Sequence, residues 1–153
     1  MAGRFEHSQD VLTLLNRDLA NEMNTMLTYL ADGLLAKGSD SLDVKEVANK
    51  FAAQDFVHVK KIAARIVELD GVPQLMPLAI DNNASIDAKM PPRDGAIKPI
   101  LKDLLECDLQ STLELRSQIQ TIGFLDPTTC LLLEEVLADK EHQTEEIRDL
   151  LGI

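Results

Sequence analysis

The chain of 153 residues contains no tryptophan, and only 3% of its residues are aromatic. Its core must therefore be mainly aliphatic, which suits packed helices better than a sheet-rich fold. No apolar run approaches the length of a membrane-spanning helix, and the first residues lack the apolar segment of a secretory signal. We therefore expect no membrane contact and a cytoplasmic location.

Basic residues and cysteines are also scarce. The 15 Lys and Arg residues face 26 Asp and Glu residues, which gives a formal net charge of −11. Binding to the nucleic-acid backbone needs clustered basic side chains, and no such cluster is present, so we expect no nucleic-acid partner. Two cysteines, Cys107 and Cys130, cannot build a disulfide framework. Their expected helical positions lie roughly 20 Å apart, beyond the reach of a disulfide.

What the chain does contain is apolar residues at helical spacing in four segments. The pattern predicts helices over about 8–37, 43–70, 99–123 and 127–150 within a single domain, 1–153. Between the second and third segments, residues 73–95 break the pattern with several prolines and an Asn-Asn pair. A connection of this length is a functional loop or a crossover. The sequence therefore predicts an all-α, antiparallel four-helix bundle with one long crossover between helices two and three.

Three helix starts have sequence signals. Ser8 is a candidate N-cap of the first helix. Asp43 followed by Glu46 is similar to a capping box and predicts the start of the second. Asp126 followed by Pro127 has the pattern of an N-cap with proline at the first helical position, which predicts the start of the fourth.

An acid followed three residues later by histidine occurs twice, once in the second predicted helix and once in the fourth. The two motifs are Asp55-Phe56-Val57-His58 and Asp139-Lys140-Glu141-His142. Residues three apart share a helix face, so each pair can reach one point. Ionised groups on an apolar stripe are costly to bury unless they are paired or bound to metal.

Two more acids lie at a matching depth on the other helices. Counting back from the first turn places Glu22 opposite His58, and counting back from the second places Asp108 opposite about residue 143. Glu106 is a rival for the third-helix position, since it precedes Asp139 by the same 33 residues that separate Glu22 from Asp55. With Asp108, the set contains four carboxylates and two histidines, which is the ligand set of a di-iron or di-manganese bundle: Glu22, Asp55, His58, Asp108, Asp139 and His142.

A simpler interpretation is a bundle whose polar groups only bond one another, because a lone acid-x-x-His pair is common on helix surfaces. Tyr29 follows the same inward stripe as Glu22, as a core aromatic whose hydroxyl is satisfied or as a functional group. The residues themselves leave these alternatives open.

Over nearly its whole length the chain resembles the ferritin-like superfamily, most closely bacterioferritins and Dps-like ferritins. The spacing from Glu22 to Tyr29 is similar to that of a terminal iron ligand and the nearby tyrosine. The segment from Asp55 and His58 to Pro73 resembles the second-helix ligand segment, and residues 104–108 resemble the third. Asp126-Pro127-Thr128-Thr129, leading to Asp139 and His142, is similar to the Dps-like fourth helix.

The resemblance implies roles for these residues. Glu22 and Asp108 would be terminal ligands, Asp55 and Asp139 bridging carboxylates, and His58 and His142 nitrogen ligands, with Tyr29 as the catalytic residue. The implied activity is oxidation of Fe(II) by dioxygen or peroxide at two iron ions per subunit, manganese being possible, followed by iron storage and detoxification in a homo-oligomeric cage.

The chain also departs from the family pattern. Aspartate stands at Asp55, Asp139 and Asp108, where glutamate is usual at the bridging positions. Phe56 lies near the position of the haem-ligating methionine of bacterioferritins, so no haem is expected. The chain ends with the fourth helix, which favours a twelve-subunit shell. Alternatives are another di-metal enzyme, manganese catalase-like or an oxidase, and a metal-free structural ferritin-like protein.

Overall fold

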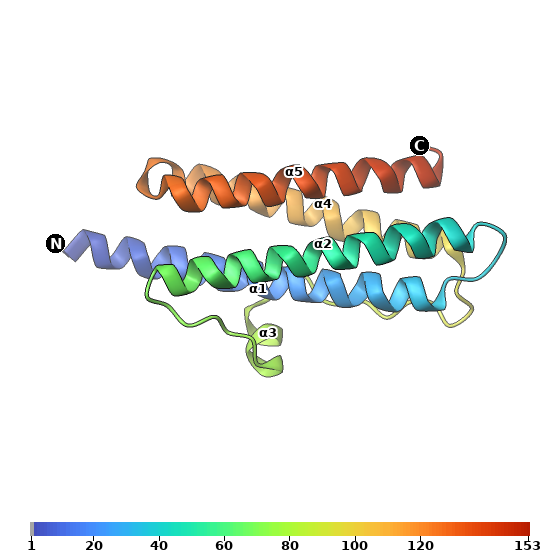
Figure 1. The fold of residues 1–153 in the computed structure, drawn as a ribbon, viewed down its shortest axis with the longest axis horizontal. Coiled ribbons are helices and arrows are strands. Elements are labelled where there is room, and N and C mark those ends of the chain that lie inside the picture. The colour runs from blue at the N-terminus through green and yellow to red at the C-terminus, as the bar shows by residue number, and fades with distance from the viewer. Residues whose placement is uncertain (1) are drawn as a thin grey trace.

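A computed structural model describes the backbone of residues 2–153 and the side chains of residues 9–153. Its four long helices are α1 (Ala2–Leu35), α2 (Ser41–Glu68), α4 (Ile97–Ile122) and α5 (Pro127–Leu151). Helix α1 pairs with α2, and α4 pairs with α5 through a 3-10 turn, Gly123–Leu125; the two hairpins lie alongside each other (Figure 1). The predicted all-α bundle with a crossover between the second and third long helices is confirmed.

One of the three predicted helix starts agrees with the structure, and the other two differ. Helix α5 begins at Pro127, and the Asp126 side chain accepts a hydrogen bond from Thr129 N at 3.1 Å, as predicted for an N-cap. Helix α2 begins at Ser41, before the predicted capping box, with no side-chain cap. Helix α1 already runs from Ala2, so Ser8 does not start it; the Ser8 side chain lies outside the described residues.

The crossover contains a short helix, α3 (Pro77–Asn83), and is hydrogen-bonded along α1. Asn21 Oδ1 accepts from the backbone N–H groups of Ser85 and Ile86 at 2.9 and 3.0 Å. Farther along α1, Thr28 Oγ1 accepts from Lys89 N at 3.1 Å. Polar residues on the outer side of α1 thus satisfy the crossover backbone and fix its path.

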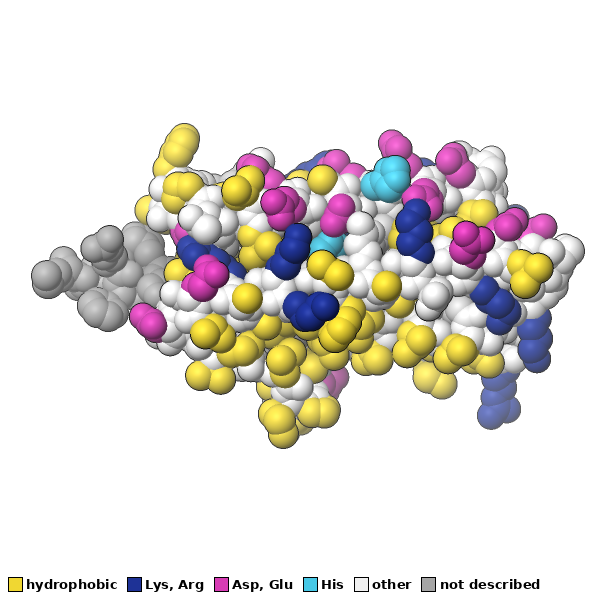
Figure 2. Space-filling view, in the orientation of Figure 1, with side chains coloured by type: hydrophobic (Ala, Val, Ile, Leu, Met, Phe, Trp, Pro, Cys, Tyr) yellow, Lys and Arg dark blue, Asp and Glu magenta, His cyan; other side chains and the backbone are white. Residues whose placement is uncertain are grey.

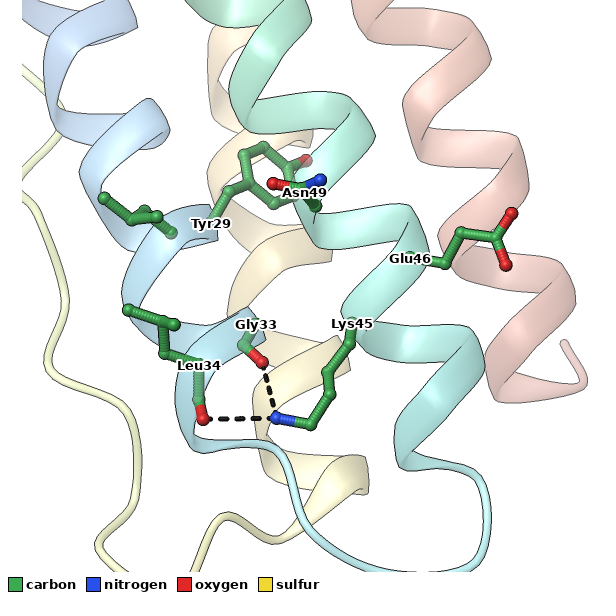
Figure 3. A pocket seen from close by; sticks show the side chains of 7 residues that line it. Tyr29, Gly33, Leu34, Lys45, Glu46 and Asn49 are labelled. Carbon is green, nitrogen blue, oxygen red and sulfur yellow. Dashed lines mark hydrogen bonds between the residues drawn. The ribbon is translucent and has the colours of Figure 1, made fainter.

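The end of α1 is held by contacts from two other segments. Lys45 Nζ of α2 donates to the carbonyls of Gly33 and Leu34 at 2.9 and 3.1 Å (Figure 3). These belong to the last helical turn, whose carbonyls lack partners within the helix. Gly95, at the end of the crossover, has φ +69°, and a Cβ there would lie 2.0 Å from the Leu35 carbonyl oxygen. Only glycine allows this approach.

The core consists of two apolar layers separated by a polar one. The layer near the α4–α5 turn is aliphatic and includes Leu15, Leu19, Ile62, Ile66 and Leu133. The layer toward the α1–α2 turn contains Tyr29, Phe51, Ile100, Leu104 and Ile147. Each long helix contributes to both layers, so the residues between them are held at one level by apolar packing on either side.

Asp126 should stabilise the turn between α4 and α5, because it caps α5 and also accepts from Arg65 Nη2 of α2 at 2.9 Å. We expect Asp126→Ala to lower the free energy of unfolding by about 1–2 kcal/mol in urea denaturation. Asp40→Ala is the matched control, since Asp40 is the N-cap residue of α2 but makes no cap hydrogen bond.

The effect of Asp126→Ala should depend on pH. Burial raises the pKa of Asp126, but hydrogen bonds from Thr129 and Arg65 outweigh it and hold that pKa below its ordinary value. A depressed folded-state pKa stabilises fully above the unfolded-state value and loses this effect as pH falls through the folded-state value. The difference in the free energy of unfolding between native protein and Asp126→Ala should therefore shrink as the pH falls below about 4. A gap that persists unchanged at lower pH would contradict the ionised cap.

Candidate metal centre

All four long helices send polar side chains into the layer between the two apolar cores. Their side chains are almost completely excluded from solvent. The layer comprises Glu22 from α1, Asp55 and His58 from α2, Asp108 from α4, and Lys140 and Gln143 from α5. Burial of so many polar groups is costly unless they pair with one another or with a ligand.

Three of these groups converge on one side of the layer. His58 Nδ1 lies 3.0 Å from Glu22 Oε2 and 3.7 Å from Asp55 Oδ1. One potential ligand atom from each residue lies within 4.8 Å of the others. The predicted alignment of Glu22 with His58 across the first hairpin is confirmed by this contact.

The second ring nitrogen of His58 points toward α5. His58 Nε2 lies 2.7 Å from Asp139 Oδ2, and the Asp139 side chain is 43% exposed. Burial lowers the pKa of His58, but Glu22 and Asp139 raise it above its ordinary value. Without a metal, the imidazolium can therefore donate from both nitrogens. Asp139 binds the histidine from outside the polar layer.

Lys140 of α5 lies at the centre of the layer. Its Nζ is 2.7 Å from Asp55 Oδ1, 3.4 Å from Glu22 Oε2 and 3.8 Å from Asp108 Oδ1, and its side chain is fully buried. Burial lowers the pKa of Lys140, but these carboxylates more than compensate and raise it. Burial also raises the pKa of Asp55 to about 6, although Lys140 opposes that shift. The centre of the bundle thus contains an ammonium group.

The rotation of α5 differs from the sequence-based prediction. Val136, Lys140, Gln143 and Ile147 face inward, at helical spacings of four, three and four. His142 is 70% exposed and pairs with Glu146 on the surface, so it is not brought to the centre. Neighbouring residues on a helix point about 100° apart around its axis. With Lys140 on the inward face, the acid-x-x-His motif of Asp139 and His142 lies off that face. The sequence does contain a signal for this rotation, since Lys140 follows Val136 by four residues and therefore shares its face of the helix.

On α4 the structure separates the two candidate acids. Asp108 is fully buried and accepts a hydrogen bond from Tyr29 OH. Glu106 is exposed and pairs with Lys89 Nζ at 3.0 Å. Burial raises the pKa of Asp108 to about 7, although Lys140 opposes the shift. Asp108 is therefore the α4 acid that faces the polar layer, with Tyr29 as its hydrogen-bond donor.

Neither of the two thiols belongs to the metal-ligand cluster of the described residues. Cys107 and Cys130 are both buried and free, as expected from their separation in sequence. Burial raises the pKa of Cys107 to about 11. A thiol that stays protonated near neutral pH is a weak metal ligand, because the thiolate is the binding form.

The donor set fits one divalent cation. Asp55 Oδ2 is buried and has no hydrogen-bond partner among the described residues. Glu22 and Asp55 offer carboxylate oxygens beside the imidazole nitrogen Nδ1 of His58, and these are ligands suited to iron or manganese. Helix α5 brings to the centre the ammonium of Lys140, which has no lone pair to offer a metal ion. Of the six predicted ligands, four face the layer, Asp139 contacts His58 from its edge, and His142 lies on the surface.

The fold and this carboxylate–histidine layer define a helical bundle of the ferritin class. The model of the ferritin-like domain matches residues 12–153, and the chain belongs to that family. A search of curated protein sequences finds no match. None of the helices in the described part of the chain has the length and apolar character needed to cross a membrane.

Solved structures with the same fold include Dps proteins and a bacterioferritin-related protein. The dodecameric thioferritin of Bacteroides fragilis is 24% identical, with a TM-score of 0.91 over 95% of this chain and 86% of that one. Dps from Thermosynechococcus elongatus is 18% identical, with a TM-score of 0.91 over 97% and 94%. Dps from Vibrio cholerae O1 is 16% identical, with a TM-score of 0.88 over 95% and 91%. At these identities the similarity establishes the fold.

Tyr29→Phe tests how the polar layer is held together. The substitution removes the donor to Asp108 Oδ2, while Asp108 Oδ1 already lacks a hydrogen-bond partner among the described residues. We expect a loss of about 1–3 kcal/mol in the free energy of unfolding, measured by denaturant titration with circular dichroism. Thr121→Val, which removes an exposed hydroxyl from α4, should have little effect. Equal stability of the two variants would contradict a structural role for the Tyr29 hydroxyl.

Proposed function

We propose that this chain is a subunit of an iron-storing ferritin-like assembly, and that each subunit takes up one Fe(II) ion at Glu22, Asp55 and His58. Family membership and the donor set support this proposal, and the observation that carries it is the convergence of these three buried side chains on one point. The Vibrio cholerae Dps is described as a member of a superfamily of ferritin-like diiron-carboxylate proteins. The chain's charge of −11 favours accumulation of cations at its surface.

The contacts of His58 support a specific mode of binding. Nδ1, which faces Glu22 and Asp55, would supply the lone pair, while Nε2–H donates to Asp139. A histidine ligand commonly donates its other N–H to a carboxylate, which fixes the ring and makes it more basic. Asp139 therefore acts on the ion through His58 and positions that ligand.

Iron uptake is better supported than rapid two-iron oxidation. A second iron would need ligands from α5, where Lys140 and Gln143 lie. One Fe(II) ion supplies one electron, whereas reduction of dioxygen to hydrogen peroxide takes two. We therefore propose capture of Fe(II) as the role of the site, followed by slower oxidation in which two Fe(II) ions from separate sites each give one electron to one molecule of dioxygen or peroxide. Tyr29 contributes by holding Asp108.

A metal-free structural role is the second candidate, and one observation favours it. Lys140 pairs with the buried carboxylates, so the chain itself supplies a cation to the polar layer. The two candidates differ in metal content, which is measurable.

Metal binding should depend on the acid-x-x-His motif that contains His58 and not on the one that contains His142. After anaerobic reconstitution with Fe(II) and gel filtration, we expect about one iron per subunit by elemental analysis. His58→Ala should remove most of this iron, because it deletes the nitrogen ligand. His142→Ala is the matched control and should leave iron content unchanged, since His142 lies on the surface. Iron-free native protein would favour the structural role.

An independent measurement is available because Tyr29 is the only tyrosine and the chain has no tryptophan. Tyr29 contacts Asp108 in the polar layer, so its fluorescence reports on that layer alone. Fe(II) titration should quench the emission in native protein and in His142→Ala, but not in His58→Ala. Identical quenching in all three would contradict binding at this site.

Exposed apolar side chains on α1 and the crossover support assembly into an oligomer. Hydrophobic side chains gather along the edge of the molecule where α1 and α3 lie (Figure 2). Leu30 and Leu34 of α1 are 47% and 72% exposed, and Leu78 of α3 is 72% exposed. Apolar surface of this kind marks interaction sites. The Bacteroides fragilis relative is described as dodecameric, and we propose a homo-oligomer, with twelve subunits favoured.

The assembly should be sensitive to charge on this apolar surface. Leu34→Glu combined with Leu78→Glu should shift the protein from a large assembly toward smaller species in analytical ultracentrifugation, because two carboxylates would have to be desolvated at the contact. Leu34→Met is the control and should leave the assembly intact. An unchanged assembly in the double variant would place the subunit contacts elsewhere.

A further inference from the structure

We propose that the Lys140 ammonium is a built-in cation that takes the place of a second metal ion in this bundle. The inference rests on the proposed function, in which Glu22, Asp55 and His58 hold the first cation. Its consequence is a hybrid centre, with one exchangeable metal and one ammonium group that is covalently tethered to α5.

The first observation is the register of α5. Lys140 and Gln143 are three residues apart and face the layer, as Asp55 and His58 do on α2. Two-metal carboxylate bundles take an acid and a histidine at this spacing from each of two helices. Here α5 keeps the spacing and the inward face but replaces the acid by lysine and the histidine by glutamine.

The second observation is where the ammonium lies. Nζ of Lys140 contacts carboxylates from α1, α2 and α4, at 2.7 to 3.8 Å. Several carboxylates in one buried layer repel one another and cannot all stay ionised without a positive partner. A metal ion would supply that charge from solution, whereas Lys140 supplies it from the chain.

The third observation concerns the two oxygens of Asp55. Oδ1 accepts from Lys140 Nζ at 2.7 Å and from Gln143 Nε2 at 3.2 Å. Oδ2 has no hydrogen-bond partner among the described residues. Asp55 is thus bonded to the ammonium through Oδ1, which also lies 3.7 Å from His58 Nδ1, while the lone pairs of Oδ2 are not engaged by any described residue.

Restoring the acid and the histidine should restore the second metal position. Mn(II) is a suitable probe because it does not oxidise readily during the measurement. In equilibrium dialysis, native protein should bind about one Mn(II) per subunit and the double variant Lys140→Glu, Gln143→His about two. Lys140→Glu alone tests whether replacing the ammonium by a carboxylate is sufficient to restore the second metal position. A folded double variant that binds no more Mn(II) than native protein would overturn the proposal.

The second arm measures stability without metal, so it does not depend on the double variant. Lys140→Met in a chelator leaves the buried carboxylates without their cation, and we expect the midpoint of thermal unfolding to fall by roughly 10 °C. Mn(II) should then raise this midpoint more in Lys140→Met than in native protein. Lys61→Met is the matched control, since it removes an exposed ammonium that pairs with Glu135 of α5 at 3.7 Å. Equal midpoints for the two methionine variants would overturn the proposal.

The outcomes separate this inference from the proposed function. Native protein that binds two Mn(II) ions would show that Lys140 yields to a metal, which overturns the inference and leaves a metal-binding function in place. Native protein that binds none, with a double variant that does bind, would overturn the proposed function and support Lys140 as a substitute cation.

Discussion

Charge pairing inside the bundle is the constraint on which the rest of this structure depends. Lys140 and Asp55 meet at 2.7 Å with both side chains fully buried, and two further carboxylates approach the same ammonium. Loss of one partner from such a cluster would leave an uncompensated charge in a low-dielectric interior. The four helices must therefore keep a common level and rotation, and the apolar layers on either side maintain them.

The same cluster limits the chemistry available to the bundle. Helix α2 presents a carboxylate and an imidazole, while α5 presents an ammonium and an amide at equivalent spacing. The two hairpins thus share a geometry but differ in charge, so that one side of the layer offers ligands and the other offers a cation. Asp139 and Tyr29 act from the edges, the first by bonding His58 and the second by bonding Asp108.

The crossover shows how the outer side of α1 serves a different purpose from its inner side. Asn21 and Thr28 bond the crossover backbone, while Glu22 and Tyr29 point into the bundle. Adjacent residues on one helix can serve both purposes because they lie about 100° apart around its axis. The exposed leucines of α1 and α3 form a third, apolar surface, where subunits of an oligomer could meet.

The sequence by itself determined the helical class, the crossover and the first hairpin of the site. Apolar periodicity fixes which residues are helical, and the short turn between α1 and α2 lets Glu22 be matched to His58 by counting. Only the tertiary structure decided which face of α5 is buried and that Asp108, rather than Glu106, faces the layer. The reason is physical: Asp139 and Lys140 are adjacent, about 100° apart around the helix axis, and the apolar periodicity of this helix does not decide which of them faces the core. Packing of Val136 and Ile147 against the other helices selects that rotation, and with it places Lys140 at the centre.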